Sequence, residues 1–110
     1  MRRLTLTMAI GGIGLLAGFA QNTGSAENGK QLFFKNGCYE CHGTVGQGGT
    51  GPRLAPRPLT AAALTAYVRK PGAGMPPYSA KVMSDAEAAD IRAYLATIPE
   101  PPKDIPLLKP

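Results

Sequence analysis

The sequence predicts a small all-α domain with three main helices. Apolar residues recur at helical spacing in three separate segments, and no stretch of useful length alternates between apolar and polar residues. The 110-residue chain also has few aromatic side chains and no tryptophan, so a core built from its own side chains is thin. We therefore expect another group to supply apolar bulk to this core.

The N-terminal segment has the layout of a secretory leader. A short basic start precedes an uncharged apolar run, Leu4 to Ala20, and the small residues Gly24-Ser25-Ala26 follow it. We expect cleavage after Ala26, which makes residues 1–26 a signal peptide, with cleavage after Ala20 as the alternative. A retained run would tether the protein to a membrane, although its length is at the lower limit for a span.

The rest of the chain divides into a domain, residues 27–99, and a proline-rich tail, residues 100–110. The formal net charge of +5 includes two arginines that leave with the leader, and no basic cluster stands out. A nucleic-acid partner is therefore not expected. Apolar residues in the tail, Ile105, Leu107 and Leu108, leave three alternatives: packing on its own domain, docking on a partner, or disorder.

The first predicted helix runs from Glu27 to Asn36 and stops at Gly37. A second is expected from Ala61 to about Arg69, with Thr60 as its N-cap. Its expected apolar face consists of Leu64, Tyr67 and Val68.

The last predicted helix begins with a capping box, in which Ser84 caps the third amide and Glu87 reaches back. Pro99 ends this helix. Its apolar positions at helical spacing are Ala88, Ile91, Tyr94, Leu95 and Ile98.

One motif, Cys38-Tyr39-Glu40-Cys41-His42, contains both cysteines and the only histidine of the chain. The C-x-x-C-H spacing indicates covalent haem attachment, because two thiols three positions apart add to the two vinyl groups of one haem while the adjacent imidazole ligates its iron. The alternatives are a disulfide, which would constrain little, a thioredoxin-like pair, which needs a βαβ setting, and a zinc site, which needs more ligands.

With this motif the chain resembles the small bacterial class I cytochromes c over residues 27–99. The resemblance implies three main helices wrapped around one haem c, which is bound through Cys38 and Cys41. In the family the first and last helices cross closely, with a glycine and an aromatic residue at the contact. The residues that match this pattern are Gly29, Phe33, Ile91 and Tyr94.

The resemblance also implies the iron ligands and their supports. His42 is the implied proximal ligand, and the family's Gly-Pro-x-Leu stretch supplies a proline carbonyl that orients it, here Pro52. Leu54 would pack on the haem face. Met75, followed by two prolines, matches the setting of the family's axial methionine. The alternatives are Met83, which we expect to fill the core ahead of the last helix, and an open iron position.

An iron ligated by His42 and Met75 has no open position, which implies a one-electron carrier rather than an enzyme. A haem enzyme or a ligand sensor would need a vacant position. The leader and the thioether chemistry imply a periplasmic protein, associated with the membrane only if the leader is uncleaved. The implied partners are a periplasmic dehydrogenase as donor and an oxidase or another cytochrome as acceptor. A dedicated cytochrome subunit of a flavo- or molybdo-dehydrogenase is the alternative.

Overall fold

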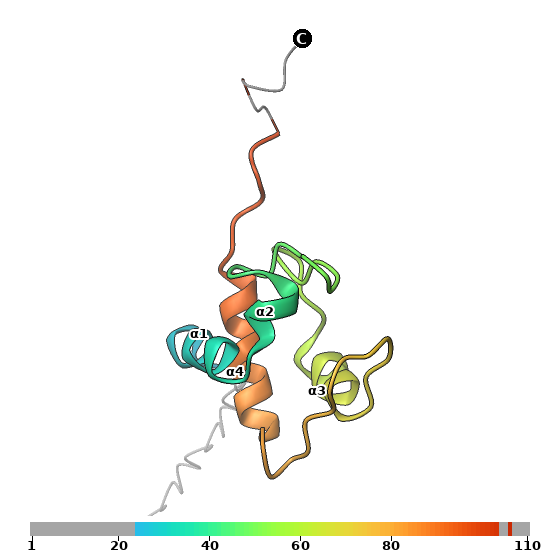
Figure 1. The fold of residues 1–110 in the computed structure, drawn as a ribbon. Coiled ribbons are helices and arrows are strands. Elements are labelled where there is room, and N and C mark those ends of the chain that lie inside the picture. Colours follow the sequence, from blue (N-terminus) through green and yellow to red (C-terminus); the bar gives the residue numbers. More distant parts are fainter. Residues whose placement is uncertain (1–23, 104–105, 107–110) are drawn as a thin grey trace, which may run out of the picture.

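A computed structural model describes residues 24–103 and residue 106. Within these residues the chain forms no strand, which confirms the all-α class. The four helices are α1 (Ala26–Lys35), α2 (Cys38–His42), α3 (Ala61–Arg69) and α4 (Asp85–Ala96). Figure 1 shows α1 crossing α4, with α2 beside them and α3 set to one side. Three of the helices are those predicted, and the short α2 adds a fourth at the cysteine motif.

The first and last of these helices, α1 and α4, cross with their backbones in contact. A Cβ atom on Gly29 would overlap the carbonyl oxygen of Asp90, and Ile91 begins on the other side of the same peptide. The Phe33 side chain is fully buried beside this contact, and its ring centroid lies 5.6 Å from that of Tyr94. The crossing expected from the sequence is therefore confirmed.

The predicted helix caps are present. The Thr60 hydroxyl accepts a hydrogen bond from the Ala63 N–H at 3.2 Å. Ser84 and Glu87 form the reciprocal capping box, at 3.1 Å from the Glu87 N–H to the Ser84 hydroxyl and 2.8 Å from the Ser84 N–H to the Glu87 carboxylate. Both helices therefore begin where the capping signals place them.

α1 begins at Ala26, one residue earlier than predicted, because Ser25 acts as its N-cap. The Ser25 hydroxyl accepts from the Asn28 N–H at 3.2 Å, and the Ser25 N–H donates to the Asp90 carboxylate at 2.6 Å. The Asn28 side chain donates to the other oxygen of the same carboxylate at 2.7 Å. The start of α1 is thus tied to the middle of α4.

One hydrophobic core joins α1, α3 and α4. Met83 is 1% exposed and fills the core ahead of α4, as predicted. Of the expected apolar face of α3, Leu64 and Val68 are buried in the core, whereas Tyr67 is 47% exposed and its hydroxyl accepts a hydrogen bond from the Gly72 N–H at 3.4 Å. The buried apolar residues are Leu32, Phe33, Ala55, Leu64, Val68, Met83, Ala88, Ile91, Tyr94 and Leu95.

The segment after α4 leaves the helices, as Figure 1 shows in red. Glu100 forms an exposed ion pair with Arg57 at 3.2 Å. The residues from Ile98 to Pro102 line a shallow groove together with Val45 and Pro56. Ile105, Leu107 and Leu108 lie outside the described residues, so the three alternatives for the tail stay predictions.

None of the helices in the described part of the chain is both long and apolar enough to cross a membrane. The apolar run Leu4 to Ala20, on which the expectation of a leader depends, lies outside the described residues.

Candidate haem-binding site

The cysteine motif forms α2, a single short helix that follows α1 after a sharp corner. Gly37 makes the corner with a φ of 74°, in the left-handed region that favours glycine. One turn of α2 carries Cys38, Cys41 and His42. The two cysteines form no disulfide; Cys38 is half-buried and Cys41 is exposed. The two sulfur-bearing residues and the histidine are thus held by one rigid element.

The His42 side chain is buried, and its orientation is fixed by one hydrogen bond. Its Nδ1 atom lies 2.7 Å from the carbonyl oxygen of Pro52. A carbonyl only accepts, so Nδ1 carries a proton and donates; in the neutral imidazole Nε2 is then the atom with the free lone pair. This is the tautomer in which a histidine ligates a metal through Nε2. The structure thus brings the His42 ring and the Pro52 carbonyl together.

The Gly51 backbone lies directly against the His42 ring. A Cβ atom on Gly51 would lie 2.9 Å from both Cε1 and Nδ1 of the imidazole. The Gly51 N–H also donates to the carbonyl oxygen of Cys41 at 2.8 Å. A larger residue at this position would push the ring away from the Pro52 carbonyl.

Further backbone hydrogen bonds tie the loop after α2 to the helix. The Gly48 N–H donates to the carbonyl oxygen of His42 at 2.8 Å. The Gly46 carbonyl oxygen accepts from the N–H groups of Leu54 and Ala55 at 2.8 and 3.0 Å. These bonds return the chain to the core, where the partly buried Leu54 packs against it.

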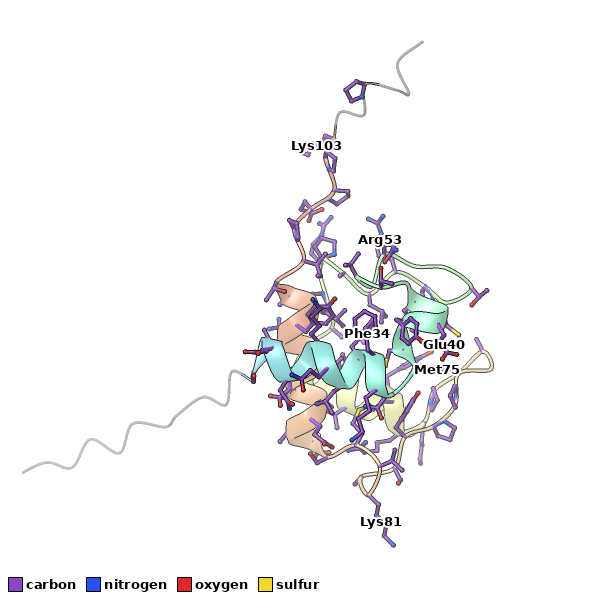
Figure 2. The ribbon with its side chains drawn as sticks, turned by 60° about the vertical axis from the view of Figure 1, so that its left-hand side comes forward. Phe34, Glu40, Arg53, Met75, Lys81 and Lys103 are labelled. Carbon is purple, nitrogen blue, oxygen red and sulfur yellow. The ribbon has the colours of Figure 1, made fainter. Side chains whose placement is uncertain are left out.

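The two candidate methionines occupy different environments. Met75 is partly buried and packs against the edge of the core, in a turn closed by its own N–H and the carbonyl oxygen of Gly72 at 3.2 Å. In Figure 2 Met75 and Glu40 of α2 are drawn toward the same side of the molecule. Met83 is enclosed in the core. Of the two methionines, only Met75 is partly exposed.

Two groups near α2 have perturbed acidities. Burial raises the pKa of the Cys38 thiol to about 11, because the thiolate would lose its hydration. Burial also raises the pKa of the Tyr78 hydroxyl, and the nearby Cys38, Cys41 and Glu40 raise it further. The Tyr78 hydroxyl also donates to the carbonyl oxygen of Asn36 at 2.7 Å, so the loop that carries Met75 ends close to the start of α2.

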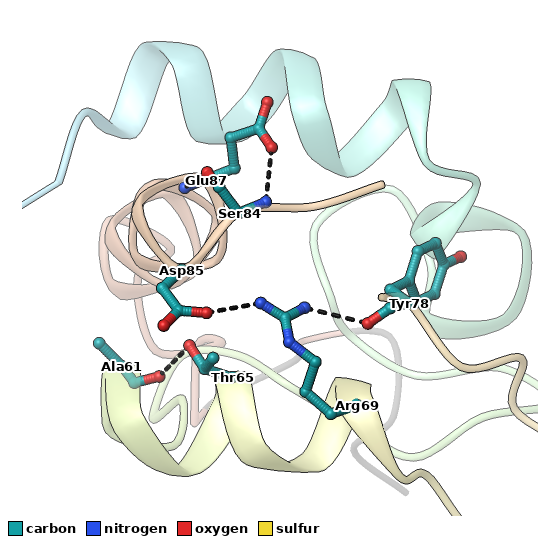
Figure 3. A network of polar contacts seen from close by, with 7 residues as sticks. All are labelled: Ala61, Thr65, Arg69, Tyr78, Ser84, Asp85 and Glu87. Atoms are coloured by element: carbon teal, nitrogen blue, oxygen red, sulfur yellow. Dashed lines mark hydrogen bonds and ion pairs between the residues drawn. The ribbon is translucent and has the colours of Figure 1, made fainter. Parts of the chain in front are cut away.

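Sequence reasoning missed a polar network at the end of this loop, shown in Figure 3. The Arg69 guanidinium donates to the carbonyl oxygen of Tyr78 at 3.0 Å and to the Asp85 carboxylate at 2.6 Å. The sequence signal was weak, since an arginine in the last turn of a helix usually indicates only a favourable charge at the helix C-terminus.

The donor atoms of this site suit haem c. In the part of the chain that the structure describes, no three His, Cys, Asp or Glu side chains come together as a metal site. The site instead offers one imidazole, two free thiols on the same turn and a thioether on a separate loop. Thiols at this spacing and a neighbouring histidine are the groups that covalent haem attachment uses.

An all-helical domain with a C-x-x-C-H motif on a short helix defines the class of cytochromes c. The chain belongs to the cytochrome c family described as cytochrome C oxidase, cbb3-type, subunit III, whose model matches residues 24–95. Comparisons with the curated proteins and with the solved structures found no match. Family membership identifies a cytochrome c domain, an electron carrier by general kind that uses haem c and exchanges electrons with redox partner proteins.

Proposed function

We propose that this protein is a periplasmic one-electron carrier with a single haem c, covalently bound through Cys38 and Cys41 and ligated by His42 and Met75. The observation that carries the proposal is the hydrogen bond from His42 Nδ1 to the Pro52 carbonyl oxygen at 2.7 Å. With Nδ1–H donating to this carbonyl, the neutral imidazole presents the lone pair of Nε2 in a fixed direction.

Each residue has a defined part in this proposal. When bound, haem c supplies an iron that accepts and returns one electron. Pro52 holds His42 in the ligating tautomer, and the hydrogen bond makes the imidazole a stronger donor. Leu54 and the adjoining core would exclude water from the haem face. The Met75 thioether, together with His42, would favour the reduced iron and raise the potential.

The arrangement of the helices supports a group that joins two sides of the molecule. α2 contacts α1, and α3 contacts α4, but α2 and α3 make no contact with each other. The thiols and His42 belong to α2, whereas Met75 follows α3. A haem attached at α2 and ligated by Met75 would link these two sides and supply the apolar bulk that the sequence lacks.

The periplasmic location rests on the leader layout and on the requirement for haem attachment outside the cytoplasm. The structure bears on where the leader would be cut. Ser25 caps α1 and donates to Asp90, so cleavage after Ala26 would remove both contacts. We propose cleavage upstream of Gly24, for which the alternative site after Ala20 qualifies. Membrane association is expected only if the leader is retained.

The proposed partners are a periplasmic dehydrogenase as donor and an oxidase or another cytochrome as acceptor. The family description names an oxidase subunit, which supports an oxidase as the acceptor. Size-exclusion chromatography of native extract tests whether the protein acts as a free carrier. Elution as a small red protein supports it, whereas co-elution with a flavo- or molybdo-dehydrogenase would establish the alternative, a dedicated enzyme subunit.

Haem staining of denaturing gels, together with absorbance spectra of the periplasmic fraction, tests the proposed site. Wild type and Glu40→Gln, a control on the same helix, should retain haem after denaturation. The double variant Cys38→Ser/Cys41→Ser should retain none, and His42→Ala should give almost no holoprotein. Normal red holoprotein from His42→Ala would overturn the proposal.

A further inference from the structure

The loop that carries Met75 has no internal hydrogen bond that holds its C-terminal end in place. Pro76 and Pro77 directly follow Met75, and neither has a backbone N–H with which to form a hydrogen bond. The turn before them is closed by the bond between Met75 and Gly72. The position of the sulfur therefore depends on how the chain is held at Tyr78, the first residue after the prolines.

Tyr78 is held by three hydrogen bonds. Its N–H donates to the carbonyl oxygen of Val68 at 2.8 Å, which fastens the loop to α3. Its hydroxyl donates to the carbonyl oxygen of Asn36 at 2.7 Å, at the end of α1. Its own carbonyl oxygen accepts from the Arg69 guanidinium at 3.0 Å. Tyr78 is thus the point at which this loop meets α1 and α3.

Arg69 extends this anchorage to α4. Its second terminal nitrogen donates to the Asp85 carboxylate at 2.6 Å, in the first turn of α4, so one guanidinium bridges the loop and the helix (Figure 3). The Arg69 side chain is 22% exposed, whereas that of Asp85 is 80% exposed. An exposed ion pair contributes little by itself, so the main effect of Asp85 is to orient the guanidinium.

We propose that Arg69 and Tyr78 form a clamp that positions the Met75 sulfur, with Arg69 acting as a positioning residue that does not itself touch the haem. This inference rests on the proposed function, in which Met75 is an iron ligand. The thioether–iron bond is weak, so its stability depends on how narrowly the loop confines the sulfur. Loosening the clamp leaves the haem attached but allows an external ligand to compete with Met75.

The test measures imidazole binding to the oxidised holoprotein, well below its melting temperature. Arg69→Ala should raise imidazole affinity about tenfold and weaken the near-infrared band of methionine-ligated ferric haem. Arg69→Lys should give a smaller increase, because an ammonium lacks the planar fork that reaches both partners. Arg92→Ala is the matched control, since it removes a guanidinium that donates to the Leu59 carbonyl oxygen at 3.3 Å, away from the clamp. It should leave imidazole affinity unchanged.

The outcomes distinguish failure of the clamp from failure of the assignment of Met75 as iron ligand. If Met75→Ala raises imidazole affinity and Arg69→Ala does not, the clamp is overturned and the proposed function stands. If Met75→Ala changes neither the band nor the affinity, the ligand assignment fails and the clamp fails with it. Equal effects of Arg69→Ala and Arg92→Ala would indicate general destabilisation and would also overturn the clamp.

A second variant keeps the test decisive if Arg69→Ala gives no holoprotein. Tyr78→Phe removes the hydrogen bond to Asn36 and keeps the ring that packs against the core. We expect it to raise imidazole affinity about threefold. If both Tyr78→Phe and Arg69→Lys have the imidazole affinity of wild type, the clamp is overturned.

Discussion

The Cα atom of Gly29 lies against the carbonyl oxygen of Asp90, so closely that a Cβ atom would overlap it. The contact allows α1 and α4 to cross backbone to backbone, with Phe33 packed on Tyr94 beside it. The crossing in turn fixes α2, because α2 follows α1 after a single glycine corner. The contact between Gly29 and Asp90 therefore helps to position the C-x-x-C-H motif, although it is not part of the site.

Gly29→Ala should lower the free energy of unfolding by about 3 kcal/mol, at the upper end of the range for overpacked cores, because the opposing atom is backbone and cannot rotate away. Thermal unfolding followed by circular dichroism measures this. Gly72→Ala is the matched control, since its Cβ atom would have 3.8 Å to the nearest atom, and it should change stability by less than about 1 kcal/mol. Equal melting temperatures for the two variants would contradict the prediction.

Exchange of each methionine should separate the iron ligand from the core residue. Met75→Ala should keep its covalent haem, lose the near-infrared band, bind imidazole or cyanide readily and show a lower reduction potential. Met83→Ala should keep the spectrum of wild type but lose about 2–5 kcal/mol of stability, because its buried side chain leaves a cavity. The reverse pattern in the absorption spectra would make Met83 the ligand.

Without haem the chain should be largely unfolded, because its own core is thin. Thiol alkylation of the haem-free protein at pH 8, mapped by mass spectrometry, provides a test. In an unfolded chain both thiols have ordinary acidity, so Cys38 and Cys41 should react at similar rates. In the folded arrangement burial raises the pKa of the Cys38 thiol to about 11, which makes its thiolate about a hundredfold scarcer.

A markedly slower reaction at Cys38 would show that the fold persists without haem. Such a folded, haem-free chain would lose stability as the pH rose from the ordinary thiol pKa towards 11, since its Cys38 binds a proton that the unfolded chain releases. A native-like helical circular dichroism spectrum of the haem-free protein would contradict the prediction independently.

The mature protein should begin upstream of Gly24. Ser25 caps α1, and its N–H donates to Asp90 at 2.6 Å, so both contacts require these residues to remain. Intact-mass measurement of the purified holoprotein identifies the N-terminus. Ser25→Ala should lower stability by about 1 kcal/mol, the usual effect of losing an N-cap side chain. A mature chain that begins at Glu27 would refute the proposed cleavage.

The local structure and the chemical type of the site could be predicted from the amino-acid sequence alone. Capping residues such as Thr60 and Ser84 fixed helix starts, because a side chain that satisfies a free backbone N–H acts within three or four residues. The C-x-x-C-H motif predicted haem attachment for the same reason: its ligands are neighbours in the chain. Gly29 and Tyr94 followed from the resemblance to a family, which supplied the pairing of distant segments.

Features that depend on contacts between segments far apart in the chain could not be predicted in this way. Tyr67 lies on a helix with an apolar pattern, yet it is exposed, because α3 presents Leu64 and Val68 to the core and turns Tyr67 toward the following loop. The spacing of apolar residues predicts the rotation of α3 about its axis only to within about one residue. In the sequence Arg69 is an ordinary cation in the last turn of a helix. Only the folded chain brings it between the Tyr78 carbonyl and Asp85. A hydrogen bond from an arginine to a distant carbonyl or carboxylate has no sequence pattern, because all three groups are common at protein surfaces.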